Sequence, residues 1–154
     1  MEKQLKVSAI KNGTVLDHIP ADQLFRVIDI LGLRLCDKPM TFGTNLDSKL
    51  LGEKAVVKIA DTFFKDEDIN KIALIAPQAK INIINDFEVV EKRILSIPPK
   101  IEGIVKCMNP VCITNHQPVK TLFTTITDER EVRLLCHYCE KITDSDNLKI
   151  ISNE

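Results

Sequence analysis

Four cysteines in the C-terminal third of the chain have the spacing of a metal site. Cys107 and Cys112 form a Cys-x4-Cys pair, and Cys136 and Cys139 form a Cys-x2-Cys pair further along. Zinc prefers four soft ligands at about 2.3 Å in a tetrahedral arrangement, and two such loops facing each other supply them. Because all four ligands are thiolates, no position is left for water. The pattern therefore predicts one structural zinc ion per chain.

Disulfide bonds are the alternative use of these thiols. A fifth cysteine, Cys36, lies far upstream, and no secretory leader is recognisable. An odd number of cysteines without a leader indicates a reducing compartment, where clustered thiols more often hold metal. We therefore favour zinc and a cytoplasmic location. His137 lies inside the second pair, and we expect it to be exposed because zinc already has four ligands.

Composition and charge limit the possible partners. Of the 154 residues, 44% are hydrophobic and 28% charged, the net charge is -1, and there are one Tyr and no Trp. A nucleic-acid binder is expected to have a basic face and stacking aromatic residues, which are missing here. No apolar run approaches the roughly 18 residues that span a membrane. A protein partner is favoured, and a zinc-ribbon nucleic-acid or transcription accessory protein is the alternative.

The first two thirds of the chain alternate between strand and helix patterns. Apolar residues recur at helical spacing from Leu24 to Leu31, before Gly32, and again from Ile69 to Ala76, before Pro77. Alternating or β-branched runs predict strands at 5–10, 40–46, 56–59, 79–84 and 87–92, and residues 14–19 are expected to be extended. The order is β-α-β-β-α-β with an extra strand. It predicts an α+β fold, with a ferredoxin-like split βαβ domain of five strands and both helices on one face.

A proline pair separates this domain from the cysteine-rich segment. Pro98-Pro99 cannot belong to a central strand and stiffens a short connection. We therefore expect one domain over 1–97 and a second over 98–154. Short strand patterns in the second part, at 101–106, 119–125, 132–135 and 148–151, predict a small all-β, zinc-ribbon-like sheet. A domain of this size buries little apolar surface, so a metal is a usual source of stability.

Several separated segments of the chain, together with the four-cysteine pattern, carry a resemblance to one known family. The segments are Val7-Ser8-Ala9-Ile10, Gly13-Thr14-Val15-Leu16-Asp17-His18-Ile19-Pro20-Ala21, Ile72-Ala73-Leu74, Ala76-Pro77-Gln78-Ala79 and Phe87-Glu88-Val89-Val90. From about Leu5 to the C-terminus, the sequence resembles the regulatory chain of aspartate carbamoyltransferase.

The resemblance implies a regulatory subunit without catalysis of its own, which controls pyrimidine biosynthesis. In that family the N-terminal domain binds the nucleotide effectors CTP and ATP, and the zinc domain docks on catalytic chains. Regulatory homodimers, three of them, tie two catalytic trimers into a dodecamer. Asn109 matches a family position that contacts the catalytic chain. By the same motifs, the nucleotide site is expected at Ala9, Ile10, Asp17, His18, Lys58, Asn82, Ile84, Val89 and Lys92, with Lys6, Ser48 and Lys54 near the phosphates or a second nucleotide.

These residue types suit a nucleoside triphosphate. Lys58 and Lys92 provide cations for the phosphates, and His18 adds a charge that changes near neutral pH. Short polar side chains and backbone groups, as at Asp17 and Asn82, suit the ribose and the base. Taken singly, each residue is ordinary, since most lysines on strands are solvated surface.

Overall fold

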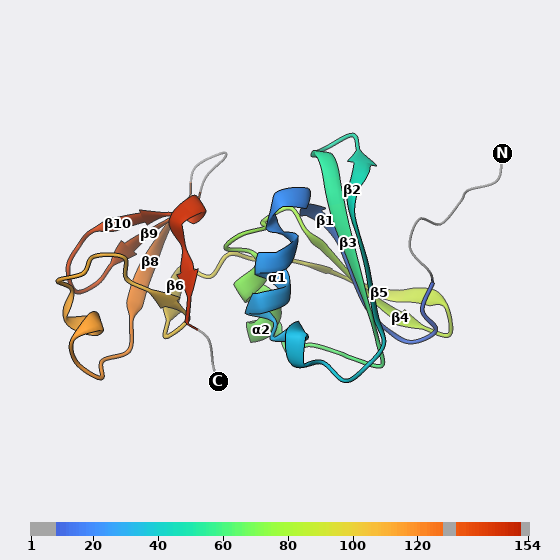
Figure 1. Cartoon of the computed structure of the whole chain (residues 1–154), viewed down its shortest axis with the longest axis horizontal. Coiled ribbons are helices and arrows are strands. Elements are labelled where there is room, and N and C mark those ends of the chain that lie inside the picture. Colours follow the sequence, from blue (N-terminus) through green and yellow to red (C-terminus); the bar gives the residue numbers. More distant parts are fainter. Residues whose placement is uncertain (1–8, 128–131, 152–154) are drawn as a thin grey trace. The chain divides into compact units, whose positions relative to one another are not determined.

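The computed structural model describes residues 9–127 and 132–151. The chain splits into two compact units, Met1–Ser96 and Ile97–Glu154, and both are drawn in Figure 1. Within the described residues, no helix has the length and apolar character needed to cross a membrane.

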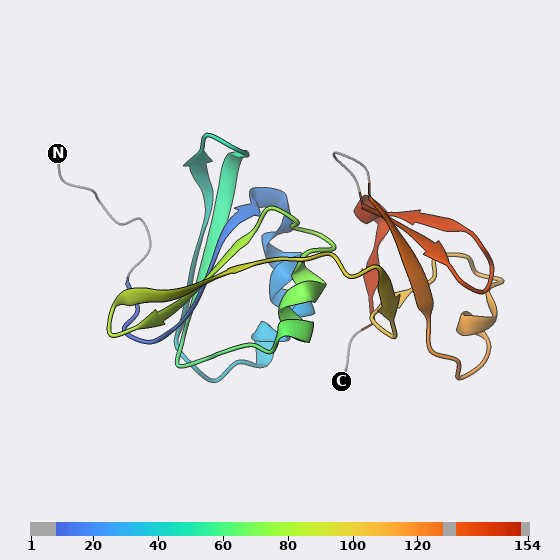
Figure 2. The ribbon, with the colours of Figure 1, turned by 180° about the vertical axis from the view of Figure 1, so that it is seen from behind.

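The N-terminal unit is a five-stranded sheet in the order β2-β3-β1-β4-β5, with every neighbouring pair antiparallel. Both views place the two α-helices on the same face of the sheet (Figure 1, Figure 2). This confirms the predicted ferredoxin-like arrangement, with β5 as the extra strand. The elements are β1 Gly13–Pro20, α1 Leu24–Ile30, β2 Met40–Ser48, β3 Gly52–Ala60, α2 Asp66–Ile72, β4 Lys80–Asn85 and β5 Glu88–Ile94.

The core of this unit lies between the sheet and the helices. Leu16 pairs with Val57 on one side and with Ile81 on the other, and all three side chains are fully buried. Directly opposed residues share a face of the sheet, so this row defines the face that the helices cover. The helices contribute their apolar stripes, with Leu24, Val27, Ile69 and Ile72 all buried. The neighbouring residues along each strand point to the opposite side of the sheet, which the helices do not cover. We call this side the open face.

The ends of the helices follow local chemistry. Gly32 adopts φ 66°, the left-handed conformation of a C-terminal cap, and its N–H donates to the Asp29 carbonyl at 3.1 Å. The second helix begins with Asp66, Glu67 and Asp68, whose charges complement its dipole. The second helix ends at Ile72, earlier than the position of Pro77 predicts. The residues between Ile72 and Pro77 form turns and do not continue the helix.

A strand is predicted over residues 5–10, but the two residues of this range that the structure describes do not belong to a strand. Ala9 and Ile10 lie outside any strand, and residues 5–8 fall outside the described part of the chain. The first described strand instead begins at Gly13. Lys11 and Asn12 just before it are tied to other parts of the unit: the Lys11 carbonyl accepts from Phe87 N–H at 2.9 Å, and the Asn12 carbonyl accepts from Asp61 N–H at 2.9 Å.

The C-terminal unit is built from short strands around a small core that includes Phe123, Leu134 and Ile101. The expected strand over 101–106 is broken in two, because Gly103 turns the backbone at φ 73°. A strand at Ile142–Asp144 was not predicted. The main sheet has the order β10-β9-β8-β6, and β7 pairs with β11. Their bounds are β6 Lys100–Glu102, β7 Val105–Lys106, β8 Leu122–Thr127, β9 Val132–Cys136, β10 Ile142–Asp144 and β11 Lys149–Ile150.

Gly13 is expected to tolerate no side chain. It has φ 143°, and an added Cβ would lie 2.1 Å from the Ile59 carbonyl oxygen. Gly13→Ala should lower the free energy of unfolding by about 3 kcal/mol or more, from a clash and a strained backbone together. Gly52→Ala is the control: it has φ 79° with open space around it, so it should cost only about 1 kcal/mol. Urea unfolding followed by circular dichroism measures both, and equal losses would contradict this account of Gly13.

Candidate functional site

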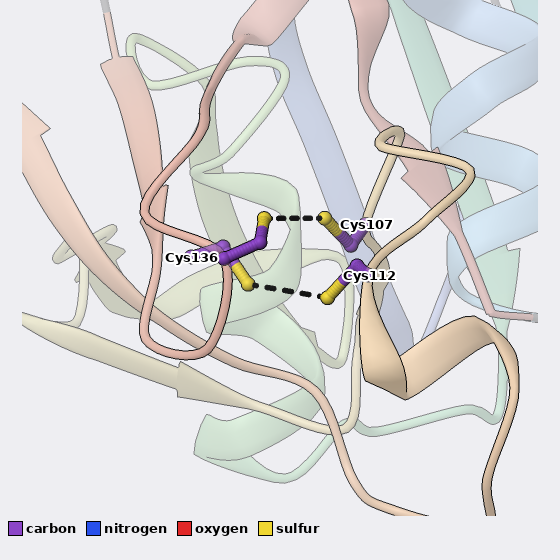
Figure 3. A group of neighbouring side chains, drawn as sticks. Cys107, Cys112 and Cys136 are labelled. Carbon is purple, nitrogen blue, oxygen red and sulfur yellow. Dashed lines mark hydrogen bonds between the residues drawn. The ribbon is translucent and has the colours of Figure 1, made fainter.

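Four sulfur atoms converge in the C-terminal unit. The Sγ atoms of Cys107, Cys112, Cys136 and Cys139 all lie within 4.8 Å of one another. The Sγ atoms of Cys107 and Cys139 are 3.6 Å apart. Those of Cys112 and Cys136 are 3.8 Å apart (Figure 3). A tetrahedron with arms of about 2.3 Å has edges of about 3.8 Å, so these separations suit four thiolates around one zinc ion. The donor set is closed, as expected of a structural metal centre.

Two loops deliver these sulfurs. Cys107 follows β7 and Cys112 precedes a 3-10 turn, η3 Ile113–Asn115, while Cys136 ends β9 and Cys139 lies in the turn toward β10. Each loop is closed by its own backbone: Cys112 N–H donates to the Asn109 carbonyl and Glu140 N–H to the Cys136 carbonyl, both at 3.0 Å. Cys107, Cys112 and Cys136 are buried, so a metal held there is shielded from water.

Burial sets the proton affinity of the thiols. It raises the pKa of Cys107 to about 12 and also raises the pKa of Cys136. Burial acts in the same direction on Cys139, but hydrogen bonds from the Asn109 side chain and the Lys141 backbone outweigh it and lower that pKa to about 7. A zinc ion must therefore displace protons from Cys107 and Cys136, which makes its binding dependent on pH.

Sequence reasoning missed the polar side chains that support this centre. The Thr114 hydroxyl donates to Cys112 Sγ at 3.2 Å, and Asn115 Nδ2 donates to the carbonyls of Cys107 and Asn109 at 3.0 and 2.8 Å. Their position, two and three residues after Cys112, is the only signal that the sequence offers for this role. Asn109 is half-buried, and its side chain contacts both loops: its Oδ1 accepts from Val111 N–H at 3.2 Å, and its side chain also hydrogen-bonds Cys139. His137 is exposed, as predicted.

The open face of the N-terminal sheet carries most of the residues expected to bind nucleotide. Val15 pairs with Lys58 on β3 and with Asn82 on β4, and Asn82 pairs with Lys92 on β5. These four residues form one row across four strands, so their side chains share a face. Ile84 and Val89, which pair with each other, lie further along β4 and β5. Strand register thus gathers side chains that are far apart in the sequence.

Asp17 and His18 lie at a bulge in β1, where the pairing with β3 shifts between Leu16 and Ile19. His18 adopts φ 58°, and Asp17 Oδ1 accepts from its N–H at 2.6 Å. Lys54 Nζ forms an ion pair with Asp17 Oδ1 at 2.9 Å. His18 Nδ1 is 3.5 Å from Asp17 Oδ2 but is buried without a hydrogen bond.

Lys58 lies in the same electrostatic neighbourhood. Burial lowers the pKa of its ammonium group, and the carboxylate of Asp17 acts in the opposite direction. A partly buried lysine that loses solvation gains most from an additional anion. Lys54, Lys58 and the carboxylate of Asp17 therefore interact electrostatically in this part of the sheet.

Ala9, Ile10 and Ser48, which are also expected to bind nucleotide, lie outside the row of paired residues. Ala9 and Ile10 precede β1, next to Lys11, whose carbonyl binds the turn between β4 and β5. Ser48 ends β2, and its Oγ accepts from Leu51 N–H at 3.1 Å, so it caps the β2–β3 turn. Lys6 lies outside the described residues.

Removing the metal should unfold one unit and spare the other. We expect zinc chelation, or Cys136→Ser, to abolish the protection of backbone amides in β8, β9 and β10, because the four thiolates hold both loops together. Amides in β1 and β3 should stay protected. Hydrogen exchange measured by mass spectrometry reports on both units at once.

The matched control is Cys36→Ser, which changes the cysteine outside the cluster. It should leave the zinc content and the exchange pattern as in the unaltered chain. Unchanged protection of β8–β10 after complete zinc removal would show that the metal does not hold this unit together.

Comparison with known proteins gives a consistent result over both units. Residues 5–96 match the family model described as "Aspartate carbamoyltransferase regulatory chain, allosteric domain", and residues 99–149 match "Aspartate carbamoyltransferase regulatory chain, metal binding domain". Proteins named aspartate carbamoyltransferase regulatory chain are similar throughout. That of Bacteroides fragilis is 51% identical over 150 residues, 97% of each chain. That of Phocaeicola vulgatus is 49% identical, over 97% of this chain and 96% of its own.

A third relative is similar over nearly the whole chain. The protein of that name from Pyrococcus abyssi is 47% identical over 147 residues, covering 94% of this chain and 96% of its own length. Both family models and all three relatives point to the same assignment as the four-cysteine centre. This chain belongs to the family of aspartate carbamoyltransferase regulatory chains.

Proposed function

We propose that this non-catalytic regulatory chain binds CTP and ATP on the open face of its N-terminal sheet and passes the signal to catalytic chains through its zinc unit. The observation that carries the nucleotide site is the row Lys58, Asn82 and Lys92, which strand pairing places on one face. The domains over 1–97 and 98–154 then have separate tasks, nucleotide sensing and docking.

Lys58 and Lys92 would bind the phosphates, which CTP and ATP have in common. They lie on β3 and β5, on either side of β1 and β4, so a triphosphate could bridge them. Lys54, held by Asp17 at 2.9 Å, and Ser48 would serve the outer phosphates or a second nucleotide, together with Lys6. The lowered pKa of Lys58 supports this role, because a bound anion would restore the stability of its charged form.

The base and ribose would lie at the other polar groups of the face. His18 Nδ1 is buried without a hydrogen bond, and such an atom costs free energy until a ligand or water satisfies it. Asp17 and Asn82 can bind hydroxyl and amino groups, and backbone groups at Ala9 and Ile10 can read the base edge. Ile84 and Val89 would supply apolar contact.

The partner of the zinc unit would be the catalytic chain of aspartate carbamoyltransferase. Apolar side chains are exposed around the metal centre: Val111 is 80% exposed, and Met108 and Tyr138 are also exposed. Such a cluster suits a protein interface, and Asn109 lies among these residues. We place the assembly in the cytoplasm, as a dodecamer of two catalytic trimers and three regulatory homodimers, where thiols stay reduced.

Regulation would follow from a population shift. A nucleotide can move the catalytic trimers between low- and high-affinity states only by its own difference in affinity for them, which is typically worth about 1 to 3 kcal/mol. CTP and ATP would compete for one site and favour opposite states. The alternative of a nucleic-acid accessory protein is not favoured, because the family match covers both units and the net charge is only -1.

The shared phosphate contact can be tested with one lysine. Lys92→Ala should weaken CTP and ATP binding together, by about tenfold each, since both lose the same charge-assisted hydrogen bond. Lys65→Ala is the control, because Lys65 precedes the helix α2 on the covered side of the sheet and is exposed. Isothermal titration of the zinc-loaded chain measures the affinities. A large loss for only one of the two nucleotides would rule out a common phosphate contact.

The regulatory role is tested in the reconstituted complex. With its catalytic trimer, the chain should form a larger assembly, seen by mass, whose aspartate saturation curve shifts in opposite directions with CTP and ATP. Coupling of about 1 to 3 kcal/mol corresponds to shifts of roughly 5- to 150-fold in affinity. If saturating nucleotides leave the curve unchanged while the complex assembles, the chain has an assembly role and no nucleotide signalling.

A further inference from the structure

Three consecutive side chains after Cys112 are hydrogen-bonded back to the loop between the first two metal ligands. Thr114 and Asn115 lie in the 3-10 turn η3, and His116 follows as its C-cap residue. Their partners are spread over the loop, from Cys107 to Cys112. We refer to Thr114, Asn115 and His116 as the clamp.

The clamp contacts the metal ligand itself through Thr114. Its hydroxyl donates to Cys112 Sγ at 3.2 Å. A hydrogen bond to a metal-bound thiolate draws off part of the negative charge that four thiolates concentrate around one zinc ion. The half-buried position of Thr114 shields this bond from competing water.

The rest of the clamp holds the backbone of the loop. Asn115 Nδ2 donates to the carbonyls of Cys107 and Asn109, at 3.0 and 2.8 Å. His116 Nε2 donates to the carbonyl of Pro110 at 2.7 Å. Three carbonyls of one short loop thus receive side-chain donors from one turn.

The Cys107–Cys112 loop loses more conformational freedom on folding than the Cys136–Cys139 loop. Four residues separate Cys107 from Cys112, whereas two separate Cys136 from Cys139. Each additional residue that must be fixed costs conformational entropy. The longer loop therefore needs additional hydrogen bonds to keep both sulfurs in position, and the clamp supplies them.

We propose that Thr114, Asn115 and His116 are positioning residues that hold the Cys107–Cys112 loop in its metal-binding shape, with Thr114 slowing zinc loss and Asn115 fixing the backbone around Asn109. The two roles are separable. Thr114 acts on a ligand sulfur, and Asn115 acts on carbonyl groups that do not bind metal.

The role of Thr114 is tested by zinc release. Zinc-loaded chain is mixed with excess colorimetric chelator, and the release rate is followed. Thr114→Val keeps the shape but loses the hydroxyl, so release should be about tenfold faster. Thr114→Ser keeps the hydroxyl and should stay within about twofold of the unaltered chain. Equal rates for Thr114→Val and the unaltered chain would overturn this role.

Cobalt provides a second readout that does not depend on release. The thiolate-to-cobalt absorption band of the substituted chain should shift in Thr114→Val and return in Thr114→Ser, because the donor to Cys112 is lost and regained. Should Thr114→Val bind no metal, Thr114→Ala takes its place in both measurements. A band that stays unmoved in the variant without the hydroxyl speaks against the sulfur contact.

The role of Asn115 is tested by hydrogen exchange in the zinc-loaded chain. Asn115→Ala should retain one zinc ion but exchange the amides of Met108, Asn109, Val111 and Cys112 about tenfold faster, having lost two hydrogen bonds. Asn147→Ala, at an exposed asparagine in the 3-10 turn Ser145–Asn147 of the same unit, is the control and should change nothing there. Unchanged exchange in Asn115→Ala would overturn the proposal for this residue.

Binding to the catalytic trimer extends the test and rests on the proposed docking role. If Asn109 contacts the trimer, both Asn109→Ala and Asn115→Ala should weaken the complex. If Asn109→Ala binds as tightly as the unaltered chain while Asn115→Ala exchanges faster, the docking contact is wrong and the clamp stands. If Asn109→Ala weakens the complex and Asn115→Ala neither exchanges faster nor binds less tightly, the clamp is wrong.

Discussion

The convergence of four cysteine sulfurs is the constraint on which the C-terminal unit depends. Its strands are short, from two to six residues, and sheets of that size bury too little surface to be secure alone. Four thiolates that bind one ion join the loop after β7 to the end of β9. Bonds to the metal then stabilise a unit whose apolar core is small. Three of the cysteines are buried, and a thiolate charge without a counter-charge is energetically costly in a buried position. A bound cation offsets that cost.

The N-terminal unit uses the two faces of its sheet differently. Its helices cover one face of the sheet and bury the row of Leu16, Val57 and Ile81, which leaves the other face available. Antiparallel pairing then brings Lys58, Asn82 and Lys92 into line. The position of a bulge at Asp17 and His18 turns two more polar residues to the same region. The proposed binding face is thus formed by strand register, and the buried core that stabilises the sheet lies on the opposite face.

Much of this architecture could be predicted from the sequence, because periodicity and ligand spacing are local signals. The stripe from Leu24 to Leu31 and the cysteine pairs are read directly from the residues. Other features could not be found this way. Gly103 interrupts a strand pattern that looked continuous, and Ile142–Asp144 is too short to carry a pattern. Thr114 and Asn115 became visible only through their contacts, since a hydroxyl and an amide near a ligand have no distinctive spacing.

X-ray absorption at the zinc edge tests the central claim most directly, since it reports the atoms bound to the metal in the intact chain. We expect one zinc ion per chain with four sulfur neighbours at about 2.3 Å and no oxygen or nitrogen in the first coordination sphere. A spectrum with fewer than four sulfurs, or a purified chain without stoichiometric metal, would contradict it.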